Sequence, residues 1–203
     1  MTVAVIDYRA GNLRSVETAL RHLDADFFVT ADPEGVMEAD RVVFPGVGEA
    51  QAAMDVLNES GLAQAIGEFY RSGKPLLGIC LGCQIMMERS EERNAVCLGL
   101  LQGRVVRFAQ KFGLKVPHMG WNQVDFTREH PLFNGIPSGS SYYFVHSYYV
   151  EPEDDAVVLA RTDYGIEFPS VVGWENLTAV QFHPEKSGRI GLRLLANFLS
   201  RDL

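Results

Sequence analysis

Short apolar runs alternate with amphipathic stretches through the first half of the chain. The apolar runs lie at residues 3–6, 27–30, 42–44 and 76–79. Between them are stretches whose apolar residues recur at helical spacing, at residues 16–23, 50–57 and 62–70. A continuous apolar run is typical of a strand that is covered on both faces. The alternation of strand and helix therefore predicts a parallel sheet with helices on both faces.

The second half of the chain has a different pattern. Strand-like segments follow one another across short turns, at residues 105–106, 114–116, 142–150, 156–161, 171–174 and 178–182. Such a run favours antiparallel strands that extend the sheet or flank it. A last helix is predicted at residues 187–199. We therefore expect an α/β fold in a single domain, residues 1–203, with a mostly parallel central sheet extended by antiparallel strands in the C-terminal half.

Composition narrows the classes of function. The 203 residues carry a net charge of −8, which argues against a nucleic-acid backbone as partner. No apolar run is long enough to span a bilayer, and the first residues lack the basic start of a signal peptide. Three cysteines are a low, odd number that fits a reducing compartment rather than a disulfide framework. We expect a cytoplasmic protein without a membrane or nucleic-acid partner.

The stretch from Lys74 to Met87, KPLLGICLGCQIMM, carries the first candidate chemistry. It predicts a short strand, a tight corner and the start of a helix, with Cys80 in a G-x-C-x-G pattern at the corner. This is the cysteine form of the nucleophile elbow, whose turn is so sharp that glycine is needed two residues either side of the nucleophile. The corner would lift Cys80 off the sheet edge, and the start of the helix would favour its thiolate.

Other interpretations of Cys80 stay open at this point. A single free cysteine is more often a packing residue than a nucleophile. Cys80 and Cys83 also form a C-x-x-C, the spacing of thiol redox proteins and of half a zinc site. A zinc site would need further ligands, and the chain offers only Cys97 and no H-x₃₋₅-H pair. Thiol redox chemistry is therefore the stronger of these alternatives.

Two further segments could complete a site around a thiolate. His183 and Glu185 are two residues apart, which places them on one side of an extended segment, and Pro184 keeps His183 out of helical conformation. A carboxylate beside an imidazole fixes its tautomer and stabilises its cation, so His183 could serve as base and acid. Oxyanion donors could come from the N–H of Leu81 and from the glycine loop Gly46, Val47 and Gly48.

The order glycine loop, G-x-C-x-G and H-P-E resembles the class I glutamine amidotransferases, the type with a Cys-His-Glu triad and a flavodoxin-like fold. The resemblance covers essentially the whole chain. Three segments are similar to a narrower group in that family, the glutaminase subunits of imidazole glycerol phosphate synthase in histidine biosynthesis. They are PHMGWN at residues 117–122, YFVHSY at residues 143–148 and FHPEKSG at residues 182–188.

The resemblance implies a function and roles for particular residues. Cys80, His183 and Glu185 would hydrolyse glutamine to glutamate and ammonia through a glutamyl thioester. Contacts to the glutamine amino and carboxylate ends would come from Gln84, His146, Ser147 and Tyr148. The ammonia would pass to a (β/α)8 cyclase subunit of the HisF type, which makes imidazole glycerol phosphate and AICAR from PRFAR. The face toward this partner would include Asn12, Trp121, Tyr143 and Lys186. We expect neither a cofactor nor a metal ion.

Three alternatives stay open. The chain could be a class I glutaminase subunit of another pathway, such as anthranilate or pyridoxal phosphate synthesis. It could be a C-x-x-C thiol oxidoreductase, or a non-catalytic binding module on the same fold. Within the glutaminase hypothesis, the flexible loop Gly46–Gly48 can turn an N–H toward the site or away from it. We therefore expect low glutaminase activity without the partner.

Overall fold

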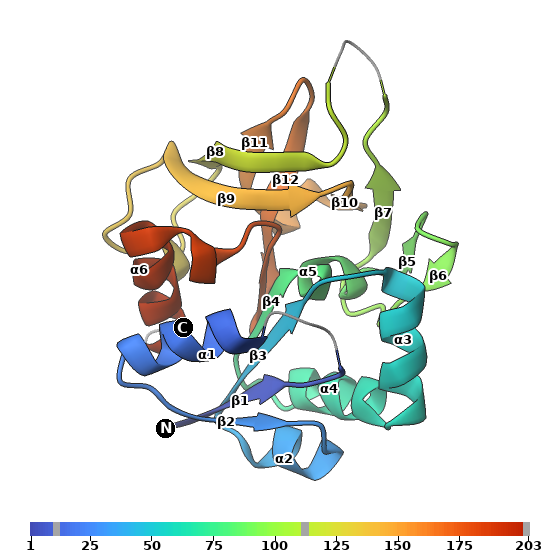
Figure 1. Cartoon of the computed structure of the whole chain (residues 1–203), viewed down its shortest axis with the longest axis vertical. Helices are drawn as coiled ribbons and strands as arrows, with labels where there is room; N and C mark the ends of the chain where they lie inside the picture. The colour runs from blue at the N-terminus through green and yellow to red at the C-terminus, as the bar shows by residue number, and fades with distance from the viewer. Residues whose placement is uncertain (10–12, 111–113, 201–203) are drawn as a thin grey trace.

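The computed structural model describes residues 1–9, 13–110 and 114–200. Its first half alternates strands and helices as the sequence predicts (Figure 1). The strands are β1 (Thr2–Ile6), β2 (Asp26–Thr30), β3 (Arg41–Gly46) and β4 (Leu76–Cys80). The helices are α1 (Leu13–His22), α2 (Pro33–Glu38), α3 (Ala50–Glu59), α4 (Leu62–Arg71) and α5 (Leu81–Ile85).

The second half of the chain is mostly strand. Its strands are β5 (Arg89–Ser90), β6 (Ala95–Val96), β7 (Gly103–Arg107), β8 (His118–Phe126), β9 (Ser140–His146), β10 (Tyr148–Pro152), β11 (Val158–Asp163), β12 (Glu167–Trp174) and β13 (Leu177–Val180). Three short 3₁₀ turns lie among and after them, η1 (Pro131–Phe133), η2 (Asp155–Val157) and η3 (Pro184–Lys186). The helix α6 (Gly188–Leu199) follows η3.

The strands form a large sheet and a small one. The nine-stranded sheet has the order β2-β1-β3-β4-β13-β12-β11-β8-β9, and the small sheet has the order β10-β7-β5-β6. The strands from β2 to β13 in that order are parallel, and β12, β11, β8 and β9 add to them in antiparallel fashion. This architecture confirms the predicted α/β fold with its antiparallel extension.

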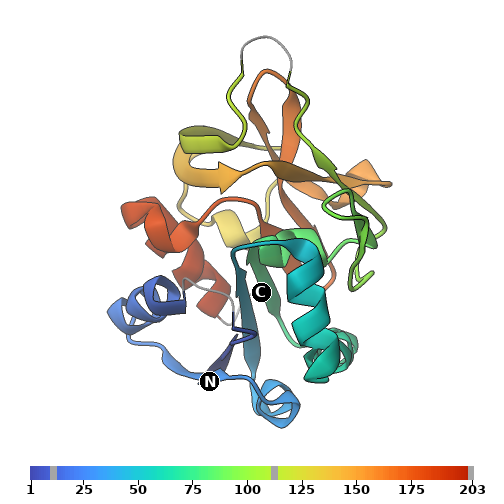
Figure 2. The same cartoon turned by 45° about the vertical axis from the view of Figure 1, so that its right-hand side comes forward.

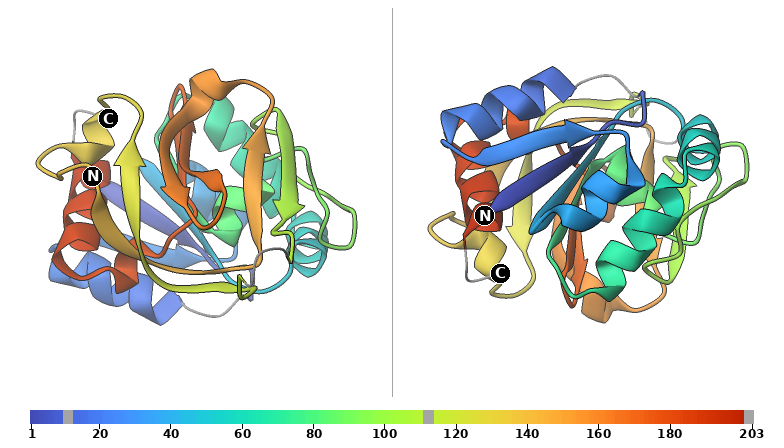
Figure 3. Two further views of the ribbon diagram at one scale, coloured as in Figure 1. Left: turned by 90° about the horizontal axis from the view of Figure 1, so that it is seen from above. Right: turned by 90° about the horizontal axis from the view of Figure 1, so that it is seen from below.

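Helices cover both faces of the parallel strands (Figures 2 and 3). On one face α1 and α6 bury Val16, Leu20, Leu194 and Phe198 against Val3, Val5 and Val43 of the sheet. On the other face α2, α3 and α4 bury Val36, Leu57, Ile66 and Phe69 against Ala4, Ile6 and Phe44. Alternate residues of β1 and β3 thus face the two layers, which is why these strands contain apolar residues at nearly every position.

Several predicted elements are wrong in detail. Residues 114–116 are not a strand, and the neighbouring strand is β8 instead. The single strand expected at residues 142–150 is two strands, because the chain leaves the large sheet at Ser147 and joins the small one as β10. The helix α2 was not predicted; Asp32 caps it with a hydrogen bond from the Glu34 N–H, and Pro33 occupies its first turn. No helix in the described part of the chain is long and apolar enough to cross a membrane.

Candidate active site

The register of three parallel strands brings the predicted catalytic segments together. Gly46, at the end of β3, is paired with Cys80, at the end of β4. On the other side of β4, Val180 of β13 is paired with Ile79, so the chain continues from there into His183. The glycine loop and the histidine segment therefore flank Cys80 at the carboxyl edge of the sheet, where ligand sites of such sheets form.

Cys80 has the backbone of a nucleophile elbow. Its φ of 56° and ψ of −108° lie outside the regions that residues with a side chain ordinarily adopt. Such backbone strain is typical of a functional turn. The two flanking glycines are required by close contacts. A Cβ on Gly82 would lie 2.0 Å from the Phe44 carbonyl oxygen, and one on Gly78 would lie 2.8 Å from the Gly82 carbonyl oxygen. The helix α5 that follows has five residues, shorter than the sequence suggests.

His183 and Glu185 form a buried pair. His183 Nδ1 lies 2.8 Å from Glu185 Oε1, and their side chains are 1% and 0% exposed. The backbone of His183 is held as well: its N–H donates to the Tyr143 carbonyl, and its carbonyl accepts a hydrogen bond from the Ser187 hydroxyl. Ser187 also accepts the Tyr143 N–H, so it ties the histidine segment to β9. The sequence interpretation gave Ser187 no role.

The charge state of His183 follows from its neighbours. Burial would lower its pKa, but the Cys80 sulfur and the Glu185 carboxylate outweigh burial and raise the pKa to about 10. His183 Nε2 is buried, and no described residue meets it with the geometry of a hydrogen bond. The Cys80 sulfur and the Glu185 carboxylate both favour the imidazolium form of His183.

Two glutamines contact each other near Cys80. Gln181 is fully buried, and its Nε2 lies 3.9 Å from Cys80 Sγ. Its Oε1 accepts a hydrogen bond from Gln84 Nε2 at 3.1 Å. Cys83, the other half of the C-x-x-C, is completely buried, and burial raises the pKa of its thiol strongly. Because thiol exchange needs a thiolate, this environment argues against the redox alternative.

A cavity of about 350 Å³ lies at this edge of the sheet. Most of its lining was predicted from the sequence, namely Val47, Gly48, Cys80, Leu81, Gln84, His146, Ser147, Tyr148 and His183. Pro117, Val145 and Glu92 also line it and were not predicted. Glu92 Oε2 accepts the Ala50 N–H at 2.7 Å, which fixes this carboxylate at the cavity. Its position among surface charges at residues 88–93 gives no signal in the sequence.

The glycine loop lies against a buried tyrosine. Val47 and Gly48 line the cavity, and Gly48 has a φ of 103°, a conformation suited to glycine. Gly46 is closed in: a Cβ there would lie 2.4 Å from the Tyr8 hydroxyl and 2.8 Å from the Gly82 nitrogen. Burial and the nearby Cys80 raise the pKa of Tyr8, while the Val47 N–H acts in the opposite direction. The Tyr8 hydroxyl is therefore packed against the glycine loop and is influenced by the charge of Cys80.

The residues predicted for a partner face lie at and near the β8–β9 pair. Trp121 is 59% exposed, pairs with Tyr143 across the strands, and meets its ring edge-on with centroids 6.2 Å apart. Lys186 is exposed in η3, and Met119 of β8 is also exposed. Asn12 lies outside the described residues. Through the Tyr143 carbonyl, this face is one hydrogen bond away from His183.

The described residues contain no group of three or more His, Cys, Asp or Glu side chains that could hold a metal ion. The cavity instead offers a thiol, an imidazole–carboxylate pair, a carboxylate and the N–H groups of a glycine loop. Leu81 begins α5, so its N–H has no partner within the helix and remains available. This set can attack a carbonyl carbon, hold the resulting oxyanion and protonate a leaving group.

Known proteins resemble this chain over its whole length. A protein from Chromobacterium violaceum named "Imidazole glycerol phosphate synthase subunit HisH" is 53% identical, and the match covers 100% of this chain and 99% of that protein. A protein of the same name from Nitrosococcus oceani is 51% identical, with 98% and 97% covered.

Solved structures share the fold. The structure of PurLQS from Thermotoga maritima has a TM-score of 0.77 at 18% identity, with 98% of this chain and 97% of that chain covered. A crystal structure of a glutamine amidotransferase has a TM-score of 0.75 at 22% identity, with 97% and 96% covered. The family model described as "Glutamine amidotransferase class-I" matches residues 4–201. The chain belongs to the class I glutamine amidotransferase family.

Proposed function

We propose that this chain is the glutaminase subunit of an imidazole glycerol phosphate synthase. The observation that carries the proposal is the register that sets the Gly46–Gly48 loop and the His183–Glu185 pair on either side of Cys80. Relatives that are 53% and 51% identical over nearly their full length carry the name of that subunit. The proposal extends to residues 1–203 as a single domain and to a cytoplasmic location, which three free cysteines support.

In the proposed reaction Cys80 attacks the carboxamide carbon of glutamine. The carbonyl π electrons move to oxygen, and the N–H of Leu81 and of the Gly46–Gly48 loop stabilise that oxyanion. When the intermediate collapses, the C–N bond breaks, and the His183 imidazolium donates its proton so that ammonia leaves. A glutamyl thioester remains on Cys80. His183 then takes a proton from water, the hydroxide adds to the thioester, and glutamate leaves with the thiolate restored. Glu185 holds the Nδ1–H of His183 throughout.

The other end of glutamine is assigned to polar groups that line the cavity. Gln84, Ser147, Tyr148 and the segment at His146 line it and offer polar groups for the carboxylate and ammonium. We add Glu92, because a carboxylate fixed at the cavity suits the α-ammonium of an amino acid.

The proposed partner is a (β/α)8 cyclase of the HisF type, which uses the ammonia to convert PRFAR into imidazole glycerol phosphate and AICAR. Exposed Trp121 and Met119 beside Tyr143 and Lys186 support a docking face here, because large exposed apolar side chains next to a site suit a protein interface. Asn12 is assigned to the same face.

Co-expression with a HisF-type cyclase tests the proposal. The complex should hydrolyse glutamine when PRFAR, the substrate of the cyclase, is present. The isolated chain should hydrolyse glutamine far more slowly. Cys80→Ala should abolish the stimulated activity, whereas Cys83→Ala in the same helix start should keep it. Hydrolysis that survives Cys80→Ala would reject the proposal. A stable complex with an anthranilate-type or pyridoxal-synthase-type partner, and none with the cyclase, would assign the glutaminase to that other pathway.

A further inference from the structure

Two buried histidines lie side by side where β8 meets β9. His118 and His146 are opposite one another in the strand register, and they are 3% and 5% exposed. His118 Nδ1 lies 3.0 Å from His146 Nε2. Neither ring belongs to the triad, although His146 lines the same cavity. A polar pair in a position that ordinarily holds apolar side chains calls for a specific role.

The hydrogen bonds fix the proton on each ring. His146 Nδ1 lies 2.8 Å from the Tyr148 carbonyl oxygen, which can only accept, so this nitrogen carries the hydrogen. In a neutral ring the Nε2 of His146 is then an acceptor, and the Nδ1 of His118 must donate to it. The remaining His118 Nε2 accepts from Asn122 Nδ2 at 3.3 Å, and Asn122 also donates to the Asp163 carbonyl. Each ring nitrogen of the two histidines therefore has a hydrogen-bond partner.

Both rings stay neutral near pH 7. Burial lowers the pKa of His118 to about 4 and, together with other groups, that of His146 to about 3. His118 also stacks between Tyr164 and Phe144, with ring centroids 3.9 and 4.8 Å away. A ring packed in this way cannot turn or exchange protons readily. The pair is a fixed structural connection and not an acid or base.

The connection ends at the corner that forms the far side of the cavity. At Ser147 the chain passes from β9 of the large sheet to β10 of the small sheet. The His146 ring closes this corner through the Tyr148 carbonyl. The same carbonyl accepts Gln84 Nε2 at 2.9 Å, and Gln84 continues to Gln181 beside the nucleophile. One row of hydrogen bonds thus joins β8 to the polar lining opposite Cys80.

We propose that His118 is a positioning residue for glutamine: its Nδ1–H donates to His146 Nε2 and holds the His146 ring where its own Nδ1–H clamps the Ser147 corner in its binding shape. The inference rests on the proposed glutaminase function, and it adds a residue that does not touch the substrate. Without the His118 donor, His146 Nε2 is left buried and unpaired. The ring can reach a new donor only by turning, and a turn takes its Nδ1–H away from the Tyr148 carbonyl, which opens the corner.

Steady-state glutamine hydrolysis by the complex with the cyclase tests this. His118→Phe keeps an aromatic ring between Tyr164 and Phe144 and removes the donor. We expect a rise in KM for glutamine of about 5- to 100-fold, the range for one buried hydrogen-bonding atom left unpaired, with kcat changed much less. His118→Asn places an amide N–H where Nδ1 lies, so its KM should return most of the way to that of the wild type.

A packing control and a chemical control separate positioning from general damage. Phe168→Leu removes a ring that contacts both histidines but breaks no hydrogen bond, so its KM should stay within about 3-fold. Alkylation of Cys80 by iodoacetamide needs no glutamine site, and its rate should be equal in all variants. A KM for His118→Phe no higher than that of Phe168→Leu, or no recovery in His118→Asn, would overturn the proposal.

Nitrogen NMR of the isolated chain gives a readout that needs no activity. In the wild type His118 and His146 should both be neutral with hydrogen on Nδ1, and in His118→Phe the Nε2 signal of His146 should shift toward that of a nitrogen that accepts no hydrogen bond. An Nε2–H tautomer of His146 in the wild type would refute the clamp even if every variant were active. A wild-type complex that showed these tautomers but failed to hydrolyse glutamine would refute the proposed function instead.

Discussion

The parallel and antiparallel parts of the large sheet build the two sides of the site in different ways. In the parallel part, Gly46, Cys80 and the chain leading to His183 lie together because β3, β4 and β13 are neighbours that end at one edge. In the antiparallel part, the Ser147 corner lies where the chain leaves the large sheet for the small one. A backbone hydrogen bond from the Phe108 N–H to the Ser147 carbonyl holds it, and the His118–His146 pair across β8 and β9 adds side-chain hydrogen bonds.

The two sides of the site are held rigid by different interactions. Backbone register and close glycine contacts position the reacting atoms, and few substitutions there would keep those positions. Side-chain hydrogen bonds give the substrate end a placement that depends on single polar atoms, each of which can be removed without changing the sheet. We therefore expect substitutions in the parallel part to affect catalysis as a whole, and those in the antiparallel part to affect glutamine binding or only local stability.

The largest effect is expected at the elbow. Gly82→Ala would put a Cβ 2.0 Å from the Phe44 carbonyl oxygen, a backbone atom of β3 that cannot move without disturbing the sheet. Stimulated glutaminase activity should fall by at least about 100-fold, since small misplacements of reacting groups have large costs. Gly67→Ala is the control, because that helical glycine meets only the Arg71 side chain at 3.4 Å and should gain about 0.5–1 kcal/mol of stability. Near-normal turnover by Gly82→Ala would show that close backbone packing at the elbow does not determine where the reacting atoms lie.

A smaller but still large effect is expected at the buried pair. Glu185→Gln should lower kcat by about 10²- to 10⁴-fold, because the amide cannot stabilise the His183 cation. It should also change the stability profile with pH. The pKa of His183 is raised from 6.5 to about 10, so the stability it contributes is complete below pH 6.5 and is lost as pH rises toward 10.

Thermal melting of the wild type and Glu185→Gln between pH 6 and 10 measures that profile. The wild type should exceed the variant by the largest margin near pH 6, and the two curves should converge at the alkaline end. A margin that grew with pH would mean that His183 is not held as a cation by its neighbours.

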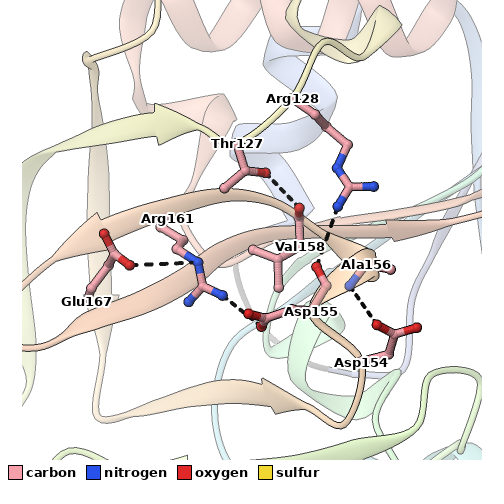
Figure 4. A network of polar contacts seen from close by, with 8 residues as sticks. All are labelled: Thr127, Arg128, Asp154, Asp155, Ala156, Val158, Arg161 and Glu167. Carbon is pink, nitrogen blue, oxygen red and sulfur yellow. Dashed lines mark hydrogen bonds and ion pairs between the residues drawn. The ribbon is translucent and has the colours of Figure 1, made fainter.

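The smallest effect is expected at the surface of the antiparallel part. Arg161 of β11 lies between Asp155, at 2.8 Å, and Glu167, at 3.8 Å (Figure 4). The two carboxylates are 84% and 68% exposed, so water and salt screen them. Asp155→Ala should cost about 0.2–1 kcal/mol, less in high salt, and should leave KM and kcat unchanged. A changed KM in Asp155→Ala would show that a surface substitution in the antiparallel part alters the site, which this comparison of the two parts of the sheet does not predict.

Most of the parallel part could be predicted from the sequence, because its strands are buried on both faces and contain continuous apolar residues. The proposed triad could be suggested for the same reason, since its motifs follow directly after such strands. The strand β8 could not be, because its pattern is inverted: the polar His118 is buried while Met119 and Trp121 are exposed. Pro117 and Gly120 further suggest a turn. Glu92 and the partner of His146 depend on contacts across the fold, which no local pattern records.

The strand order has a consequence for synthesis of the protein. β13 fills the place beside β4, so one long side of β4 has no neighbour until residues 177–180 have left the ribosome. The backbone N–H and C=O groups on that side, between buried apolar side chains, are open to stray pairing during that interval. The same delay separates Cys80 from its proposed base, because His183 lies on the segment that follows β13. The sheet is completed, and Cys80 is joined by His183, only late in synthesis, when the segment from β13 onward has been made.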